Sequence, residues 1–238
     1  MLLKLLEKSV HKGTDVMSFK FSRSYEQGYL NYKAGQFAIV DLGTKEDPEG
    51  SSRCFTIASS PTEKESILIT TRIRDTPFKK KLADLKVGEP VNIEAPLGRF
   101  VLHQDYSRPA IMLSGGIGVT PFRSMIKFAT DEKLPIKMIL FNANRNEDNI
   151  IYKNEFDEWV KFNKNLKIVY TIGQDTNDWK GETGHINKPM ISKYLNEITN
   201  SLFYICGPAG LLNAMQKLLK DEMQIPENRI MMEEFTGY

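Results

Sequence analysis

The sequence predicts two domains of different fold class, an antiparallel Greek-key β-barrel followed by a doubly wound parallel α/β sheet. The first hundred residues contain several short strand patterns separated by turn residues, with one short helix among them. From about residue 108 onward, apolar strands alternate with helices, which is typical of βαβ units. A chain of 238 residues has room for both. We place the first domain at residues 1–104 and the second at 108–230, with a tail at 231–238.

Alternation and turn residues predict the elements of the barrel domain. Residues 16–21 alternate apolar with polar side chains, as a half-buried strand does, and residues 37–42 follow a turn at Ala34-Gly35. Further strands are expected at 55–58, 67–73 and 91–94. Thr76 and Pro77 are residue types favoured at the N-cap and first position of a helix, so they predict a short helix over 77–85.

The α/β domain is expected to begin with residues 110–114, a continuous apolar run typical of a strand buried on both faces. The elements predicted after it are helix 121–130, strand 136–141, helix 153–162, strand 166–171, helix 188–195, strand 202–206 and helix 209–220. Ligands of such sheets bind at the carboxyl ends of the strands, so the residues after each strand are the first candidates for a site.

Composition excludes several classes of function. The chain has 32 basic and 30 acidic residues, and a formal net charge of +2 is too small to indicate nucleic acid as the main partner. Two cysteines are too few for a four-cysteine iron–sulfur cluster or a disulfide framework, and three scattered histidines predict no metal site. No run approaches a membrane span or a secretory leader, so we expect a cytoplasmic protein.

A glycine-rich loop follows the first strand of the α/β domain and opens its first helix. Its residues are Ser114, Gly115, Gly116, Ile117, Gly118, Val119, Thr120 and Pro121. Glycines let the backbone approach a pyrophosphate, and a helix N-terminus offers unpaired N–H groups to an anion. Thr120 is expected to cap the helix, with Pro121 at its first position. Pro121 stands where the usual dinucleotide fingerprint has its third glycine.

That variant resembles the loop of ferredoxin–NADP reductase-like proteins, and other segments extend the resemblance over nearly the whole chain. Arg53-Cys54-Phe55-Thr56 is similar to the flavin motif of this family. The resemblance implies that this segment binds the flavin. Arg53 would pair with a phosphate through its planar guanidinium, Phe55 would face the isoalloxazine or ribityl chain, and Thr56 would hydrogen-bond flavin N5.

The second flavin-phosphate segment departs from the family. Thr76-Pro77-Phe78-Lys79 stands where the family has Gly-x-x-Ser before a short helix. The helix N-terminus would still present amides to a phosphate, with Thr76 or Lys79 assisting. Thr70 and Arg72 of the preceding strand are further candidates for cofactor binding. The resemblance implies FAD as the cofactor, with FMN as the less favoured alternative.

Three further segments are similar to the nicotinamide-nucleotide site of the family. Cys206-Gly207-Pro208 resembles its Cys-Gly-Pro motif, in which the cysteine lies near the nicotinamide C4. In the tail, the resemblance assigns a carboxylate to Glu233 and an aromatic ring against the flavin to Phe235, with Tyr238 as a rival. Asn144 and Arg145 match the adenosine contact of the family. Arg145 suits a 2′-phosphate and Asp175 a free ribose hydroxyl, so NADH and NADPH both stay open, with a slight preference for NADH.

These segments together imply an NAD(P)H-dependent flavoprotein reductase. Hydride would pass from nicotinamide C4 to flavin N5, with Thr56, Cys206 and Glu233 around the reacting atoms and Thr120 near the carboxamide. The electrons would go on to a separate acceptor, such as a ferredoxin or an oxygenase component, and Lys79 to Lys81 are a candidate docking patch for an acidic ferredoxin. Two alternatives are a reductase that uses free flavin as a substrate and a nucleotide-binding subunit that works only within a larger electron-transfer complex.

Overall fold

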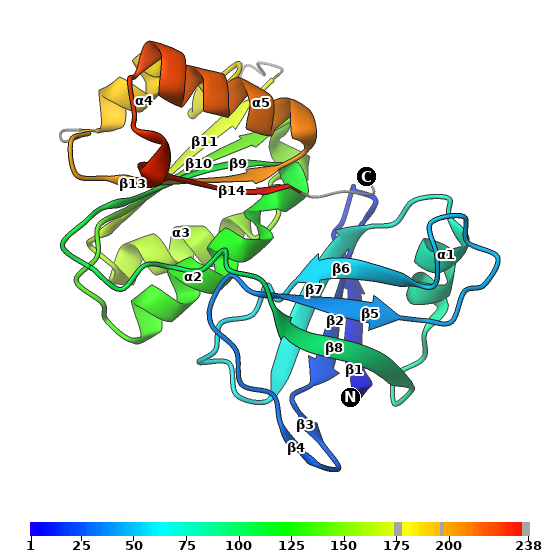
Figure 1. Ribbon diagram of the computed structural model, residues 1–238. Coiled ribbons are helices and arrows are strands. Elements are labelled where there is room, and N and C mark those ends of the chain that lie inside the picture. The colour runs from blue at the N-terminus through cyan, green and yellow to red at the C-terminus, as the bar shows by residue number, and fades with distance from the viewer. Residues whose placement is uncertain (174–177, 196–197, 235–238) are drawn as a thin grey trace. The chain divides into compact units, whose positions relative to one another are not determined.

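The computed structural model describes residues 1–173, 178–195 and 198–234, and Figure 1 traces its elements. The contacts within the chain divide it into two compact units. The first consists of Met1–Leu102 with Arg123–Phe128, and the second of His103–Phe122 with the chain from Ala129 onward. Each unit buries an apolar cluster of its own, so each is described separately.

The first unit is an antiparallel β structure, as the sequence predicts. Its main sheet has the strand order β6-β5-β8-β1-β2-β7. The strands are β1 (Leu2–Val10), β2 (Val16–Ser22), β5 (Phe37–Asp41), β6 (Ser52–Thr56), β7 (Ser66–Arg72) and β8 (Pro90–Leu97), and β3 (Ser24–Tyr25) pairs with β4 (Gly28–Tyr29) as a separate hairpin. Strand β8 returns to lie beside β1, which is the long connection typical of a Greek key.

All six strands of the main sheet contribute to one core, together with the helix α1 (Pro77–Asp84). The helix begins as predicted, because the Thr76 side chain accepts a hydrogen bond from the Lys79 N–H at 3.2 Å and Pro77 occupies the first turn. Strand β1 is absent from the sequence prediction. Only Leu3 and Leu5 of this strand are buried, so its alternation is too short to stand out.

The second unit is a parallel α/β sheet with the strand order β12-β11-β10-β9-β13-β14. Helices α2 and α3 cover one face and α4 and α5 the other (Figure 1). The strands are β9 (Ala110–Gly115), β10 (Met138–Asn144), β11 (Leu166–Ile172), β12 (Glu182–Thr183), β13 (Leu202–Gly207) and β14 (Ile230–Glu234). The strand order reverses between β9 and β13, and ligands of doubly wound sheets bind at this point.

The helices of the second unit are close to those predicted. They are α2 (Thr120–Asp131), α3 (Lys153–Phe162), α4 (Lys188–Tyr194) and α5 (Ala209–Lys217), with 3₁₀ turns η1 (Gly116–Val119), η2 (Glu147–Asn149) and η4 (Glu227–Arg229) and a π-helical turn η3 (Leu218–Glu222). The predicted tail begins instead with a strand, since β14 extends the sheet beside β13. Its pairing partner lies more than twenty residues away in the sequence, and this kind of contact leaves no local pattern.

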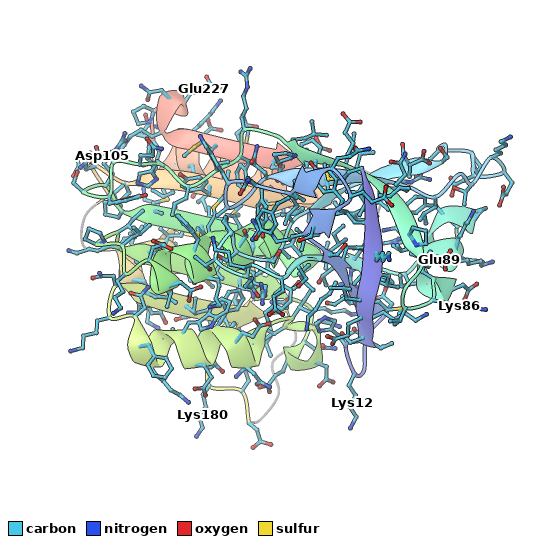
Figure 2. The ribbon with its side chains drawn as sticks, turned by 90° about the horizontal axis from the view of Figure 1, so that it is seen from below. Lys12, Lys86, Glu89, Asp105, Lys180 and Glu227 are labelled. Carbon is cyan, nitrogen blue, oxygen red and sulfur yellow. The ribbon has the colours of Figure 1, made fainter. Side chains whose placement is uncertain are left out.

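Charged side chains of both signs are spread over the surface. Figure 2 shows the labelled side chains directed outward, and all of them are exposed: Lys12, Lys86, Glu89, Asp105, Lys180 and Glu227. Within the described ranges, no helix combines the length and the apolar character that crossing a bilayer requires.

Candidate functional site

Two loops of the second unit meet at the carboxyl edge of its sheet, where β9 passes into η1 and β13 ends. A Cβ atom on Gly118 would lie 2.3 Å from the carbonyl oxygen of Cys206, which is closer than such atoms approach. Gly118 therefore allows η1 to pack directly on the end of β13. Gly116 has φ +54°, a left-handed conformation that favours glycine. Two motifs far apart in the sequence, the glycine-rich loop and Cys206-Gly207-Pro208, thus form one edge.

The structure corrects the expected role of Thr120. Its backbone is already helical, with φ −58° and ψ −45°, because η1 runs directly into α2. The buried Thr120 hydroxyl donates to the carbonyl of Ile117 at 3.1 Å. Thr120 therefore belongs to the helix and does not cap it. The residue before the turn is Gly115, which has no side chain to act as a cap.

Cys206 and Glu233 are neighbours on adjacent parallel strands, in register with each other. Cys206 is fully buried, and desolvation followed by the nearby Glu233 carboxylate raises the pKa of its thiol. Burial also raises the pKa of Glu233 to about 7. The Oε2 atom of Glu233 is buried and has no hydrogen-bond partner among the described residues. The edge therefore holds a carboxyl group that exchanges a proton near neutral pH.

A second group of buried polar side chains lies at the ends of β9 and β10. Asn144 donates from Nδ2 to Oδ1 of Asn142 at 2.9 Å, and the Ser114 hydroxyl donates to the same oxygen at 3.2 Å. Asn142 Nδ2 and Asn144 Oδ1 are buried without a partner in the described part of the chain. Asn144 was predicted from the sequence as a nucleotide contact, whereas Asn142 was not. The alternation of asparagines within an apolar strand was the signal that could have found it.

For some of the predicted nucleotide contacts the structure gives only their place and burial, and others lie outside the described residues. Arg145 follows β10 and is exposed, as is Pro208 after β13, whereas Pro121 is buried within α2. Asp175, Phe235 and Tyr238 lie outside the described residues, so their predicted roles stay predictions.

In the first unit, Arg53 is held by protein groups. Its guanidinium pairs with Asp47 Oδ1 at 2.5 Å and with Glu49 Oε2 at 3.1 Å, and its Nη1 donates to the backbone carbonyls of Glu49, Gly50 and Ser52. The other oxygen of Asp47 accepts from the N–H of Phe78 at the start of α1. The free guanidinium expected for a phosphate is therefore already neutralised. Asp47, which the sequence analysis did not name, fastens Arg53 to the helix.

Burial of the Asp47 carboxylate opposes its ionisation, but hydrogen bonds outweigh this effect. The N–H groups of Phe78 and Glu49 and the Arg53 guanidinium hold the pKa of Asp47 below its usual value. The carboxylate is thus ionised at neutral pH and is the fixed charge at this end of α1.

Phe55 and Thr56 follow Arg53 on β6 and are both buried. The Phe55 ring belongs to the core and stacks on Phe78, with 6.0 Å between ring centroids, so the open ring face that we expected is not present. The Oγ1 atom of Thr56 is buried and has no hydrogen-bond partner among the described residues. This unpartnered hydroxyl fits a polar ligand atom such as flavin N5. Cys54, on the opposite face of the strand, is exposed.

Lys79 is buried in the first turn of α1, whereas Lys80 and Lys81, which were predicted to form one patch with it, are exposed. Its ammonium donates to the Thr71 hydroxyl at 2.5 Å and lies 4.6 Å from the centroid of the Phe55 ring. The prediction of a docking patch formed by three lysines is therefore wrong, because only Lys80 and Lys81 of the three are exposed. Thr71, like Asn142 and Asp47, was not predicted from the sequence.

The neighbouring candidates Thr70 and Arg72 have structural partners. The Thr70 hydroxyl hydrogen-bonds the Ser18 hydroxyl at 2.6 Å within the sheet, and Arg72 forms an ion pair with Asp15. Because successive side chains of a strand point to opposite faces, Thr70 and Thr71 cannot both face Lys79. The structure brings Thr71 to the Lys79 ammonium. The cofactor-binding role expected for Thr70 and Arg72 stays a prediction.

Comparisons with known proteins agree with this division into two units. Residues 3–102 match the oxidoreductase FAD-binding domain family, and residues 112–217 match the oxidoreductase NAD-binding domain family. The chain is 28% identical to Flavohemoprotein A of Dictyostelium discoideum over 97% of its own length, and 26% identical to NADH-cytochrome b5 reductase 1 of Mortierella alpina over 92%.

A solved structure shows the same fold. The FAD/NAD-binding domain of a nitric oxide dioxygenase from Vibrio cholerae superposes with a TM-score of 0.85 at 18% identity, covering 98% of each chain. The present chain spans 59% of the Dictyostelium protein and 73% of the Mortierella protein. The shared part is therefore the pair of cofactor-binding domains, and several relatives are considerably longer than this chain.

Proposed function

Since the chain belongs to the ferredoxin–NADP reductase-like superfamily, we propose that it is an NAD(P)H-dependent flavoprotein reductase that passes electrons to a separate acceptor. One observation carries this proposal. The glycine-rich turn η1, the end of β13 with Cys206, and the buried carboxyl of Glu233 lie together at the switch point of the parallel sheet. A reduced nicotinamide nucleotide is the ligand that such an edge of this family suits.

The residues of the second unit would bind and orient the nucleotide. The N-terminal end of η1 and α2 would offer backbone N–H groups to its phosphates, and the absence of a side chain at Gly118 lets this turn lie close to β13. The Cys206 thiol, which is uncharged because burial raises its pKa, would present a small apolar sulfur to the reacting ring. Glu233 holds a proton at Oε1 or Oε2 near neutral pH.

The residues of the first unit would hold FAD. The Thr56 hydroxyl is one of the buried donors without a hydrogen-bond partner among the described residues, and the buried ammonium of Lys79 in the first turn of α1 would attract a phosphate. A bound flavin would supply the chemistry that the side chains lack, because it accepts a hydride and releases electrons singly. Such release is what a one-electron acceptor requires.

Related proteins suggest the class of acceptor. The relatives include an NADH-cytochrome b5 reductase, a subunit of a Na⁺-translocating NADH-quinone reductase and a glycine betaine monooxygenase reductase subunit. Each name pairs a reductase with a different acceptor. We therefore propose a protein or quinone acceptor for this chain, without choosing between those classes.

Rapid mixing of the purified, FAD-loaded protein with NADH and, separately, with NADPH tests the proposal. Loss of flavin absorbance near 450 nm within the mixing experiment is the expected result, and failure of both nucleotides to bleach the flavin would overturn it. Desalting beforehand separates the alternatives. A protein that stays yellow holds a prosthetic flavin, whereas a colourless protein that still oxidises NADH with added flavin would be a free-flavin reductase. An isolated chain inert toward an artificial acceptor would favour the subunit alternative.

A further inference from the structure

The chain between β6 and β7 has no regular secondary structure, yet side chains from other segments hold its residues 58–63 in place. The buried Arg23 guanidinium donates to two backbone carbonyls of this segment, both at 2.9 Å. The Tyr32 hydroxyl donates to a third, that of Ser59, at 3.1 Å. Carbonyl groups that lie outside helices and sheets need such partners when they are buried. The segment is therefore fixed by donors that come from elsewhere in the first unit.

Two residues of α2 donate to the same segment. Arg123 Nη1 donates to the Ala58 carbonyl at 2.9 Å and forms an ion pair with Glu63 at 3.0 Å. The Ser124 hydroxyl donates to the Ser59 carbonyl at 2.6 Å. Both residues of α2 are buried, with exposed fractions of 5% and 0%. Because charge-assisted hydrogen bonds restrict both partners, Arg123 and Ser124, which we call the α2 clamp, fix the start of the segment to the helix.

The α2 clamp stands between two features of the proposed function. Its residues follow Phe122 directly in α2, and η1, the glycine-rich turn proposed to bind the nucleotide, runs into the same helix. By their contacts, Arg123–Phe128 belong to the first unit, whereas Phe122 and the turn belong to the second. Ala58, which the clamp holds, comes two residues after Thr56 and its unpartnered hydroxyl. The helix is thus continuous with the nucleotide turn and hydrogen-bonded to the chain that carries Thr56.

We propose that Arg123 and Ser124 are positioning residues for the reduction of the flavin, which fasten the Thr56 segment to the helix that begins at the nucleotide turn. The inference rests on the proposed function, because it concerns the same reaction. In that step a hydride, with its two electrons, leaves nicotinamide C4 and forms the N–H bond at flavin N5, so the nucleotide is oxidised and the flavin is reduced. Such a transfer is sensitive to displacements of about 1 Å, even when each ligand still binds.

The Ser59 carbonyl offers a matched pair of variants, because it accepts from two hydroxyl groups. Ser124→Ala removes the hydroxyl that comes from α2. Tyr32→Phe removes the one that comes from the core of the first unit, together with its bond to the Ser60 carbonyl. The control therefore deletes at least as many hydrogen bonds to the segment. Since only Ser124→Ala weakens the link to α2, a difference between the two reports that link and not the general stability of the segment.

The experiment mixes the FAD-loaded wild type and variants rapidly with the nucleotide that bleaches the wild type, over a range of nucleotide concentrations. It gives the limiting rate of flavin reduction and the dissociation constant of the nucleotide separately. We expect Arg123→Met to lower the limiting rate about ten- to a hundredfold and Ser124→Ala about three- to tenfold, with dissociation constants within about twofold of the wild type. Arg123→Lys, which keeps a charged donor, should recover part of the rate. Tyr32→Phe should be reduced at the rate of the wild type.

Equal limiting rates in Ser124→Ala and Tyr32→Phe would overturn the inference, because the link to α2 would then make no difference. Thermal melting identifies a variant that does not fold, and if Arg123→Met fails in this way, the matched pair still decides. Failure of the proposed function looks different. A wild type that neither nucleotide bleaches contradicts the reductase and the inference with it, whereas a bleached wild type with an equally fast Ser124→Ala contradicts the inference alone.

Discussion

Glu233 has a carboxyl group whose Oε2 atom is buried and has no hydrogen-bond partner among the described residues. Its backbone is held in β14 by pairing with β13. The pKa of about 7 follows from this burial. This burial also places the pKa of the carboxyl group near neutral, as the proposed role of Glu233 requires.

We expect Glu233→Gln to stabilise the protein at high pH. In the wild type, the folded carboxyl keeps its proton up to about pH 7 whereas the unfolded one loses it near its ordinary value of 4.5. Folding stability therefore falls as the pH rises between these values. Glutamine stays neutral, so the variant should gain about 1–3 kcal/mol over the wild type at pH 8 and little at pH 4. Urea unfolding at both pH values measures this.

The neighbouring Glu234→Gln is the matched control, because the Glu234 side chain is exposed on the same strand. Its effect on unfolding should not change with pH. Equal behaviour of the two variants would show that burial at position 233 does not govern the pH dependence.

A substitution at Gly118 tests the contact between η1 and the end of β13. An added methyl group would meet the Cys206 carbonyl and the Gly207 backbone, so Gly118→Ala must displace η1 from β13. We expect a loss of about 1–3 kcal/mol in stability, the range for overpacking, together with weaker binding of the nucleotide. Gly210→Ala serves as control, since a Cβ there would meet no atom within 4 Å. If both variants bind NADH like the wild type, the meeting of the two loops is not needed for the site.

At the scale of elements, α1 depends on groups that come from outside it. Thr76 caps its first turn from the preceding residue, and Asp47 reaches it from the loop between β5 and β6 to accept from the Phe78 N–H. The same carboxylate holds Arg53 of β6. One side chain thus joins a loop, a strand and a helix at the place where the flavin phosphate is proposed to bind.

Asp47→Ala should therefore destabilise the first unit far more than Asp75→Ala. Asp75 is exposed and pairs with Lys80 at the surface, where an ion pair contributes little. The pKa of the Asp47 carboxyl is lowered, so its stabilising effect is complete at neutral pH and is lost as the pH falls through the lowered value. Thermal melts at pH 7 and at pH 3 should show the gap between wild type and Asp47→Ala narrowing in acid. A gap that is the same at both values would contradict the assignment.

For the whole molecule, two separate cores support two separate ligand sites. The first core is formed by the antiparallel strands and α1, and the second by the parallel strands with α4 and α5. Each family match covers one of these units. The chain therefore contains two cofactor-binding domains with different folds, and the proposed reaction needs both.

Hydrogen exchange followed by mass spectrometry tests this assignment of ligands. FAD should slow exchange in peptides that cover the loop before β6, β6 itself and the first turn of α1, because these segments are proposed to hold it. Oxidised nucleotide, NAD⁺ or NADP⁺, should slow exchange at η1 and at the end of β13. Protection by FAD confined to the second unit would contradict the division of roles.

The sequence was sufficient for the fold and for the order of the motifs. Alternation and turn residues predicted most strands of the first unit, and the βαβ rhythm predicted the parallel sheet, because burial patterns and caps are local properties of the chain. The helix over α3 and the cap at Thr76 were correct in detail. Strand β1 was missed because only Leu3 and Leu5 of it are buried, and β14 was missed because its pairing partner β13 is distant in the sequence.

Which charges are free was decided only by the tertiary structure. The motif placed Arg53 on a phosphate, but Asp47, six residues earlier in a loop, neutralises it. The sequence predicts Lys79 as one of three consecutive surface lysines, yet the packing of α1 buries it beside Thr71 and Phe55. Residue type and spacing determine what a side chain can do chemically. Burial and the nearest counter-charge determine whether it is available, and both arise from contacts between segments that are separate in the chain.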